Sequence, residues 1–218
     1  MKRLASVWWS LIRFGFRLLY NEMAFTYDLV SVVVSLGEWR SWQRAALKHL
    51  PADKRRDILE LAHGTGNLQI DLLENGYQTI GYDLSPYMGQ IASRKLKRRR
   101  LKGRLVRGKA QQIPFPAQQF STVISTFPTD FIFADETLKE VHRVLTDNGR
   151  FIIVPNGVLT GGGIGEKGLE WLYRITGQRG EQSTSIRDFF TQYGFEASLH
   201  EERCKRSIAQ VIVARKIP

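Results

Sequence analysis

Short apolar runs alternate along the chain with amphipathic segments, the order expected of a fold that alternates strands and helices. The apolar runs predict strands at 57–61, 79–82, 104–107, 120–127 and 150–154, followed by an antiparallel pair at 194–200 and 207–215. Helical segments fill the gaps at 66–74, 85–102 and 136–145, with later helices near 169–175 and 186–193. This order predicts an α/β fold: a doubly wound, seven-stranded sheet, mostly parallel with the last strand antiparallel, and helices on both faces.

Turn and cap residues mark the boundaries of these elements. Asn75-Gly76 is a helix stop, and Ser85-Pro86 supplies an N-cap with proline at the first helical position. Asp135 is expected to cap the helix that begins at Glu136. Three glycines at 161–163 predict a flexible loop over 155–165, which would serve either as a lid or as a connector.

Two further helices are predicted before the sheet, with a break near Gly37. We therefore divide the chain into an N-terminal helical extension, 1–50, which holds an amphipathic helix at 1–21 and cap helices, and an α/β domain, 51–218. A chain of 218 residues has room for one such domain with a sizeable core and little more.

Residues 1–20 are strongly apolar, with one narrow polar stripe at helical spacing. The stripe consists of Arg3, Ser6, Ser10, Arg13 and Arg17. The run is too short and too interrupted by arginine for a membrane span, and it lacks the small-residue cleavage site of a signal peptide. Such a helix suits the surface of a membrane, and it would also suit a position over a substrate pocket or in a dimer contact.

The stretch 58–68 predicts a strand, a glycine turn and the start of a helix. Gly64 and Gly66 let the backbone turn tightly and let a ligand approach it closely. Asp83 ends the next strand 17 residues after Gly66, near the offset of about 20 at which an acidic residue meets ribose hydroxyls in nucleotide-binding units. A dinucleotide fold would have a third glycine where this chain has Gln69, which weakens an NAD interpretation.

The pattern around this turn resembles the class I S-adenosylmethionine (SAM)-dependent methyltransferases, whose first motif is acidic-x-Gly-x-Gly-x-Gly. Here it reads Glu60-Leu61-Ala62-His63-Gly64-Thr65-Gly66, followed by Asp83-Leu84-Ser85-Pro86-Tyr87-Met88. The region from Tyr27-Asp28-Leu29 to Trp42 is similar to the pre-core segment of the ubiquinone/menaquinone-biosynthesis methyltransferases and their type 11 relatives. The resemblance implies a Rossmann-like fold, SAM as cofactor and S-adenosylhomocysteine as product.

Later segments extend the resemblance. Residues 108–115 are similar to the family's Gly-Asp-Ala-x-x-Leu-Pro-Phe, 120–127 to Phe-Asp-x-Val-x-Ser-x-Phe, and 138–151 to Leu-x-Glu-x-x-Arg-Val-Leu followed by Gly-Gly-Arg-Leu. The family's motifs then imply a cofactor site that Tyr27 covers and that His63 touches only through its backbone. Its residues are Tyr27, Glu60, Ala62, His63, Gly64, Gly66, Asp83, Leu84, Met88, Lys109, Ala110, Gln111, Ser125, Thr126 and Phe127.

Two positions depart from the family pattern. Ala62 replaces the first glycine, and its methyl group is expected to be tolerated if the backbone has negative φ, although it would crowd the methionine part of the cofactor. Lys109 replaces the acidic residue that binds the adenine amino group, and an ammonium cannot accept that hydrogen bond. Adenine would then depend on backbone groups near Ala110 and on Gln111.

The charge of the chain implies an acidic partner. Its formal net charge is +11 and its pI is near 10.0. From Arg94 to Lys109 every charged residue is positive, so this tract needs anions nearby. Anionic lipid headgroups or RNA phosphates would supply them, and a solubilising surface is the alternative. The tract contains no aromatic residue, which favours membrane over single-stranded nucleic acid.

Methyl transfer from a sulfonium needs mainly positioning and, for some acceptors, a base. Asp130 is the candidate general base because it follows the fourth predicted strand; turn formation is its alternative role. No cluster of His, Cys and Asp has metal-ligand spacing, so no metal is expected. The single cysteine, Cys204, cannot form an internal disulfide, which indicates a reducing compartment and an inert strand thiol.

The sequence therefore predicts a SAM-dependent methyltransferase, cytoplasmic and peripheral on the inner face of the membrane. The acceptor would be a lipid-soluble or small molecule, such as a quinone precursor or a lipid headgroup. An RNA-methylating enzyme that uses the basic tract and a non-catalytic SAM-binding module are the alternatives, and an NAD-linked oxidoreductase comes last.

Removal of residues 1–20 tests the membrane interpretation. We expect the shortened chain to lose sedimentation with anionic liposomes while its SAM binding is unchanged, because the apolar face and arginines would be gone. Liposome sedimentation and calorimetry measure the two properties. Unchanged sedimentation would contradict the proposal.

Overall fold

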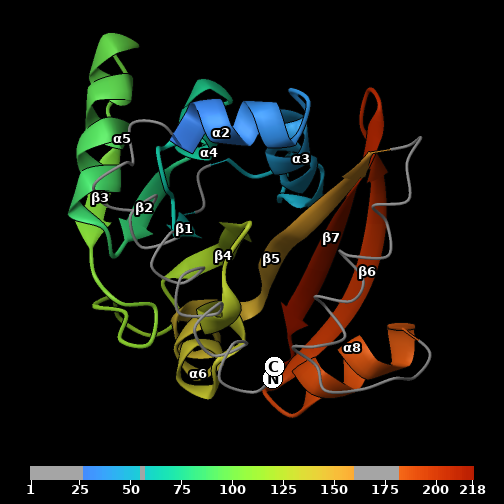
Figure 1. Cartoon of the computed structure of the whole chain (residues 1–218). Helices are drawn as coiled ribbons and strands as arrows, with labels where there is room; N and C mark the ends of the chain where they lie inside the picture. Colours follow the sequence, from blue (N-terminus) through green and yellow to red (C-terminus); the bar gives the residue numbers. More distant parts are fainter. Residues whose placement is uncertain (1–26, 55–56, 160–181) are drawn as a thin grey trace, which may run out of the picture.

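The computed structural model describes residues 27–54, 57–159 and 182–218, and a seven-stranded sheet forms their centre (Figure 1). The strand order is β3-β2-β1-β4-β5-β7-β6. The strands are β1 (Ile58–Leu61), β2 (Thr79–Asp83), β3 (Arg104–Arg107), β4 (Phe120–Thr126), β5 (Leu145–Leu159), β6 (Phe195–Arg203) and β7 (Ser207–Lys216). β1 to β5 run parallel, and β7 lies antiparallel between β5 and β6. The predicted sheet is confirmed.

The strand order reverses between β1 and β4. From β1 the chain proceeds outward to β2 and β3, then returns to the other side of β1 with β4. Ile58 therefore pairs in register with Thr79 of β2 and with Thr122 of β4. A crevice forms at such a reversal, outside the carboxyl ends of the strands, and this is where open α/β sheets bind ligands.

Both faces of the sheet are covered, because alternate residues of the central strands are apolar and buried on opposite sides. Ile58 belongs to a cluster that includes Leu68 and Leu72 of α4, while Leu59 belongs to a second cluster with Leu138 of α6. The helices after β1 are α4 (Asn67–Glu74), α5 (Pro86–Arg98), α6 (Asp135–Val144) and α8 (Gln182–Thr191). The predicted helices on both faces are confirmed (Figure 1).

Two helices precede the sheet, α2 (Tyr27–Val34) and α3 (Trp39–Ala45), and α3 continues into the short 3-10 helix η2 (Ala46–His49). The break falls at Gly37, where φ is +86°, a left-handed conformation that glycine adopts without cost. The predicted pair of helices and its break are thus correct. Figure 1 shows α2 at the periphery of the molecule, above the central strands.

Trp42 anchors α3 on the core. Its ring is buried, and the indole N–H donates to Ser207 Oγ at 2.7 Å, while the Ser207 hydroxyl donates to Glu38 Oε2 at 2.6 Å. A Cβ built on Gly157 of β5 would lie 2.1 Å from the indole, so the ring packs directly on the strand backbone. Trp42 therefore packs α3 against the sheet.

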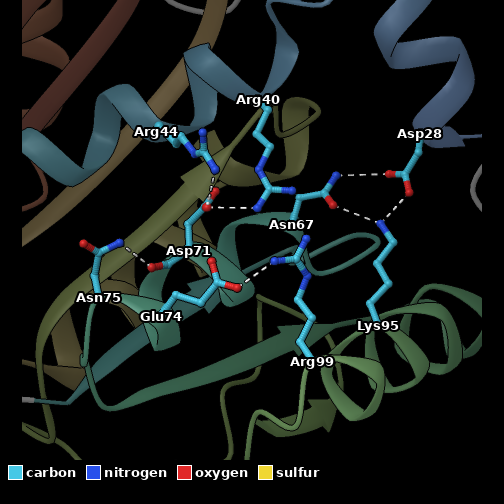
Figure 2. Close-up of polar contacts among 9 residues, drawn as sticks. All are labelled: Asp28, Arg40, Arg44, Asn67, Asp71, Glu74, Asn75, Lys95 and Arg99. Carbon is cyan, nitrogen blue, oxygen red and sulfur yellow. Dashed lines mark hydrogen bonds and ion pairs between the residues drawn. The ribbon is translucent and has the colours of Figure 1, made fainter.

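A polar network ties the start of α2 to the glycine turn and to α5 (Figure 2). The Asp28 carboxylate accepts hydrogen bonds from Thr65 Oγ1 at 2.6 Å, from Asn67 Nδ2 at 3.1 Å and from Lys95 Nζ. Lys95 also donates to Thr65 Oγ1 and Asn67 Oδ1, both at 2.9 Å. Burial alone would raise the pKa of Asp28, but these hydrogen bonds and the lysine charge outweigh it and lower the pKa. The network fixes α2 against the turn that precedes α4.

Helix α5 ends earlier than predicted. It stops at Arg98, not near Lys102, because Arg100 takes a φ of +57° and Leu101 N–H donates back to the Leu96 carbonyl. This is the hydrogen-bond pattern of a left-handed helix C-terminus. Arginine has no strong preference for that conformation, so the sequence carried no signal for it.

Three other expectations are wrong. Asp135 makes no capping hydrogen bond; Ala134 is the N-cap, and the Asp135 carboxylate accepts from the Tyr193 hydroxyl instead. β5 runs on to Leu159, because residues 156–159 pair with 207–210 of β7, so the first part of the expected loop 155–165 is strand. Cys204 lies in the turn between β6 and β7, not on a strand, and burial raises the pKa of its thiol.

Several expectations fall outside the described residues. These are the amphipathic helix at 1–21, the glycines at 161–163 and the helix near 169–175. Among the residues that the structure describes, no helix is long and apolar enough to cross a membrane.

Glu60 is a buried carboxyl group in the middle of β1. Its only described hydrogen bond comes from Gln69 Nε2 at 2.7 Å. Burial raises the pKa of Glu60 to about 8; the Gln69 hydrogen bond works in the opposite sense, and the charges of Asp83 and Asp71 add to the rise. Glu60 is therefore a neutral acid at pH 7.

The Glu60→Gln variant should be less sensitive to alkaline pH than the wild type. The folded carboxyl holds its proton more tightly than the unfolded one, so its contribution to stability is complete below the unfolded value near 4.5 and is lost as pH rises through about 8. The free energy of unfolding, measured with urea, should fall between pH 5 and pH 8.5 by a few kcal/mol more in the wild type than in Glu60→Gln. Glu196→Gln, an exposed change on β6, serves as control. Equal pH slopes in wild type and Glu60→Gln would disprove this.

Candidate functional site

A cavity of about 580 Å³ lies at the carboxyl ends of β1, β2 and β4, where the strand order reverses. Its volume is in the range of pockets that bind cofactors and drug-sized ligands. Three segments form most of its wall: the glycine turn, the end of β2 with the residues after it, and the loop after β3. The lining includes Ala62, Gly64, Asp83, Leu84, Arg107, Lys109, Ala110, Gln111, Thr126 and Phe127.

Among the residues that the structure describes, Asp83 is the only acidic one that lines this cavity. Its Oδ2 accepts the Gly64 N–H at 2.9 Å, and its Oδ1 accepts the Ser85 N–H at 2.8 Å. These two bonds fix the plane of the carboxylate at the tip of β2. An ionised carboxylate has about four acceptor positions, so each oxygen can still accept a ligand hydroxyl. A pair of ribose hydroxyls matches this arrangement.

The glycine turn is shaped by two left-handed glycines. Gly64 has a φ of +53°, and Gly66, which precedes α4, has a φ of +79°. A Cβ on Gly66 would lie 2.7 Å from Ala92 Cβ, so this glycine also permits α5 to pack against the turn. The backbone N–H of Gly64 and the end of β2 are thereby held in one wall of the cavity.

The loop after β3 forms the opposite wall. Gly108 N–H donates to the Asp83 carbonyl at 3.0 Å, and the Tyr82 hydroxyl lies 3.2 Å from the Lys109 carbonyl and 3.0 Å from the Gln112 carbonyl. These bonds hold the loop close to β2. Ala110 is buried in the wall, whereas the Lys109 and Gln111 side chains are exposed. A planar base would lie between the end of β2 and Ala110.

An aromatic stack borders the cavity on the β4 side. Phe127, which follows β4, stacks on Trp39 of α3 with ring centroids 3.8 Å apart and an interplanar angle of 25°. Behind it, Gln43 Nε2 donates to Thr126 Oγ1 at 3.1 Å. Since Phe127 and Thr126 both line the cavity, α3 supports this wall from outside.

The comparisons with known proteins agree with this geometry. Residues 58–149 match the family model of a methyltransferase domain. The chain is 36% identical over 140 residues to a demethylmenaquinone methyltransferase of Deinococcus radiodurans, covering 62% of this chain and 58% of the relative. It is 34% identical over 139 residues to the protein of that name from Thermus thermophilus, covering 62% of this chain and 63% of the relative. Residues 58–149 are therefore similar to a methyltransferase domain.

Solved structures show the same fold. A phosphoethanolamine N-methyltransferase of Haemonchus contortus, in complex with S-adenosylhomocysteine, superimposes with a TM-score of 0.61 at 15% identity, over 84% of this chain and 53% of that one. The [4+2]-cyclase SpnF also gives 0.61 at 15% identity, over 82% of this chain and 80% of the cyclase. The fold thus has solved neighbours of different activity, and fold alone does not fix the reaction. The chain spans about 60% of the length of the curated relatives it matches.

The residues predicted for the cofactor site divide into two groups in the structure. Nine line the cavity: Ala62, Gly64, Asp83, Leu84, Lys109, Ala110, Gln111, Thr126 and Phe127. Five do not: Glu60, His63, Gly66, Met88 and Ser125. Tyr27 begins α2, and its side chain lies outside the described part of the structure.

The residues of the second group support the wall from behind. Ser125 Oγ donates to the Leu61 carbonyl at 2.9 Å, and Met88 is buried in α5, where its N–H donates to the N-cap Ser85. His63 Nδ1 lies 2.8 Å from the Gly64 carbonyl. Burial lowers the pKa of His63, although the Asp83 charge works the other way, so the ring is neutral and donates from Nδ1. These residues hold the turn without facing the cavity.

Asp130 lies at the edge of the site. It begins the 3-10 helix η3 (Asp130–Phe133), and its side chain is exposed. Its neighbours Thr129 and Phe131 line the cavity, while Asp130 does not. Its role as a base stays a prediction. Among the described residues, no group of His, Cys, Asp and Glu is placed to hold a metal ion.

Sequence reasoning missed Gln43 and Arg107. Gln43 reaches Thr126 from α3, and its Oε1 is buried without a partner among the described residues. No local pattern marks a residue 83 positions away in the chain as a neighbour of the site. Arg107 lines the cavity, and its Nε donates to the Leu84 carbonyl at 3.1 Å; its position at the end of a predicted strand was the available signal.

The Ala62 methyl group was expected to be tolerated if the backbone there had a negative φ, and the structure contradicts this condition. Its φ is +55°, not negative, while its N–H donates to the Tyr82 carbonyl at 2.7 Å. The left-handed region costs a non-glycine residue about 1–2 kcal/mol. The turn therefore keeps the backbone shape that a glycine would have, and alanine is strained in it.

The Ala62→Gly variant should be more stable than the wild type. Relief of the left-handed strain outweighs the greater entropy of glycine in the unfolded chain, for a net gain of about 0.5–1 kcal/mol. Ala45→Gly, at the end of α3 where φ is −56°, should instead lose about 1 kcal/mol. Urea unfolding measures both. Equal losses in the two variants would show that Ala62 is not strained.

Proposed function

We propose that this chain transfers a methyl group from SAM to a lipid-soluble acceptor of the quinone-precursor type, while peripheral on an anionic membrane. One observation carries the first part: the Asp83 carboxylate is held at the tip of β2 by the Gly64 and Ser85 N–H groups, inside a cavity of cofactor size. The relatives' names, demethylmenaquinone methyltransferase and ubiquinone/menaquinone biosynthesis C-methyltransferase, support the acceptor class.

The residues present fit the cofactor. Asp83 would accept from its ribose hydroxyls, and the wall at Ala110 and Gln111 would receive its adenine. The Gly64 region would lie along its methionine part, where the Ala62 methyl adds bulk. When bound, SAM supplies an electrophilic methyl group. Lys109 offers no acceptor for an adenine amino group, so adenine recognition would depend on backbone groups.

The acceptor side of the cavity is mostly apolar, with Thr126 and Thr129 as its polar residues. Phe127, Pro128 and Phe131 line it after β4, and Leu84 lies at the rim with 55% of its surface exposed. Such a surface favours an aromatic ring with an apolar tail over a charged headgroup. The chain's own contribution to the reaction would be orientation of this ring and exclusion of water, which is the main requirement of an in-line displacement.

A second hollow favours the alternative in which the acceptor is RNA. It has a volume of about 780 Å³, lies between α5 and β3, and shares Asp83, Ser85, Pro86 and Arg107 with the first cavity. Its cations are Arg94, Lys97, Lys102 and Arg107. An RNA strand held there would bind with a steep dependence on salt.

Substitution of Asp83 tests the cofactor assignment. We expect Asp83→Ala to weaken SAM binding about 10- to 100-fold in calorimetry, because hydrogen bonds to a charged acceptor are lost. Asp188→Ala, an exposed change on α8, should bind as the wild type does. Thermal unfolding checks that the glycine turn survives. Equal affinity of Asp83→Ala and wild type would rule out this site.

The acceptor is tested separately with radiolabelled SAM. A demethylated quinone precursor dispersed in detergent should become labelled, and total RNA should not. Label in RNA alone would establish the alternative, and SAM binding with no label in either would favour a binding module.

A further inference from the structure

Helix α2 and the turn that follows it present an almost continuous aliphatic surface to solvent. Leu29 is 66% exposed, Val33 63%, Val34 70% and Leu36 76%, and Val30 and Val32 are exposed as well. Soluble proteins rarely expose so many adjacent large aliphatic side chains unless the surface meets a partner. The patch, which we call the α2 surface, consists of Leu29, Val30, Val32, Val33, Val34 and Leu36.

The α2 surface is held in a fixed position by the other side of the helix. Ser31 and Ser35 are buried, Ser35 Oγ donates to the Ser31 carbonyl at 2.6 Å, and Trp39 N–H donates to Ser35 Oγ at 2.9 Å. Asp28 adds its bonds to Asn67 and Lys95 (Figure 2), and it also accepts from Thr65 Oγ1. These hydrogen bonds fix the orientation of α2, so its aliphatic side chains point toward solvent.

A cationic hollow adjoins the start of α2. Its volume is about 280 Å³, and it is lined by Asp28, Arg40, Asn67, Ile70, Lys95, Arg98 and Arg99. In the described part of the chain, Asp28 is the only acid that lines it, and Asp28 is already paired with Lys95. Arg40 donates one N–H to Asp71 at 2.9 Å, but its Nε is buried without a partner among the described residues. Arg99 also donates to Glu74, at 2.7 Å. Arg98 is exposed and has no ion pair among the described residues, so the hollow offers the Arg98 guanidinium to an anion.

We propose that the α2 surface and this hollow dock the protein on a bilayer of anionic phospholipid, with headgroup phosphates at the hollow and aliphatic side chains among the acyl chains. Aliphatic side chains beside cations are the composition of an interfacial helix. A strand of RNA would need aromatic rings to stack on, and the α2 surface has none. A second copy of a chain with a net charge of +11 would bring like charge to the hollow.

This docking deepens the proposed function, on which it rests, by naming the surface that meets the membrane. Thr65 joins Asp28 to the turn that contains Gly64, and Trp39 joins α3 to Phe127, so the α2 surface and the cavity share their supports. Docking through α2 would place the apolar rim of the cavity near the bilayer. A lipid-soluble acceptor would then enter from the membrane without crossing water.

The test uses the whole chain of 218 residues and vesicles of phosphatidylcholine with about 30% phosphatidylglycerol. This composition gives the vesicles roughly the surface charge of an anionic membrane leaflet. Leu29→Gln, Val33→Gln and Leu36→Gln combined should weaken binding at least 10-fold, because aliphatic area no longer enters the bilayer. Arg98→Gln should weaken binding to these vesicles and leave binding to pure phosphatidylcholine unchanged. Ile217→Gln and Arg187→Gln, exposed changes far along the chain, are the controls.

The vesicle-binding measurements are made without SAM or acceptor, so their outcome does not depend on whether the chain transfers a methyl group. Methylation of a detergent-dispersed acceptor should be unchanged in the triple variant, and circular dichroism should show wild-type melting. Wild-type vesicle binding by the triple variant would overturn the proposal, even if residues 1–20 bind membrane alone. Loss of detergent-phase methylation would also overturn it, because α2 would then serve the cavity and not the bilayer.

Discussion

The site depends on the hydrogen bonds between one carboxylate and two backbone N–H groups. Asp83 accepts from Gly64 on one oxygen and from Ser85 on the other. The first bond joins the glycine turn after β1 to the tip of β2, and the second orients the start of α5. Because β1 and β2 are adjacent parallel strands, this carboxylate closes the crevice at the point where the strand order reverses. It would therefore be both a structural clasp and the ligand of a ribose.

Two residues close to this carboxylate, Ala62 and Glu60, are in unfavourable environments. Ala62 keeps a left-handed φ of +55°, although alanine gains nothing from that conformation. Its N–H bond to the Tyr82 carbonyl and the Asp83 bond to Gly64 hold the turn on both sides. Beneath it, Glu60 is neutral because burial opposes its charge. Strain and a buried acid are thus concentrated in one short strand-to-helix connection.

The sequence predicted the sheet well because its signals are local. Apolar runs, Asn75-Gly76 and Ser85-Pro86 fixed most strand and helix positions, and the motif resemblance found nine residues of the cavity wall. The prediction failed where contacts between distant parts of the chain determine the local structure. The left-handed Arg100 ended α5 early, β5 was lengthened by pairing with β7, and Asp135 met Tyr193. Gln43 reaches Thr126 from a distant helix, and no pattern in one sequence reveals that contact.

The position of α2 connects the two halves of the proposed function. A membrane contact can influence a cofactor site only through elements that touch both. The carboxylate of Asp28 and the ammonium of Lys95 bind Thr65, inside the glycine turn that Asp83 holds, and Asn67, the first residue of α4. Burial of the α2 surface in a bilayer would order that network from one side, and a bound nucleoside would order it from the other. Each ligand would then favour the same arrangement of the turn, which is the condition for their binding to be mutually reinforcing.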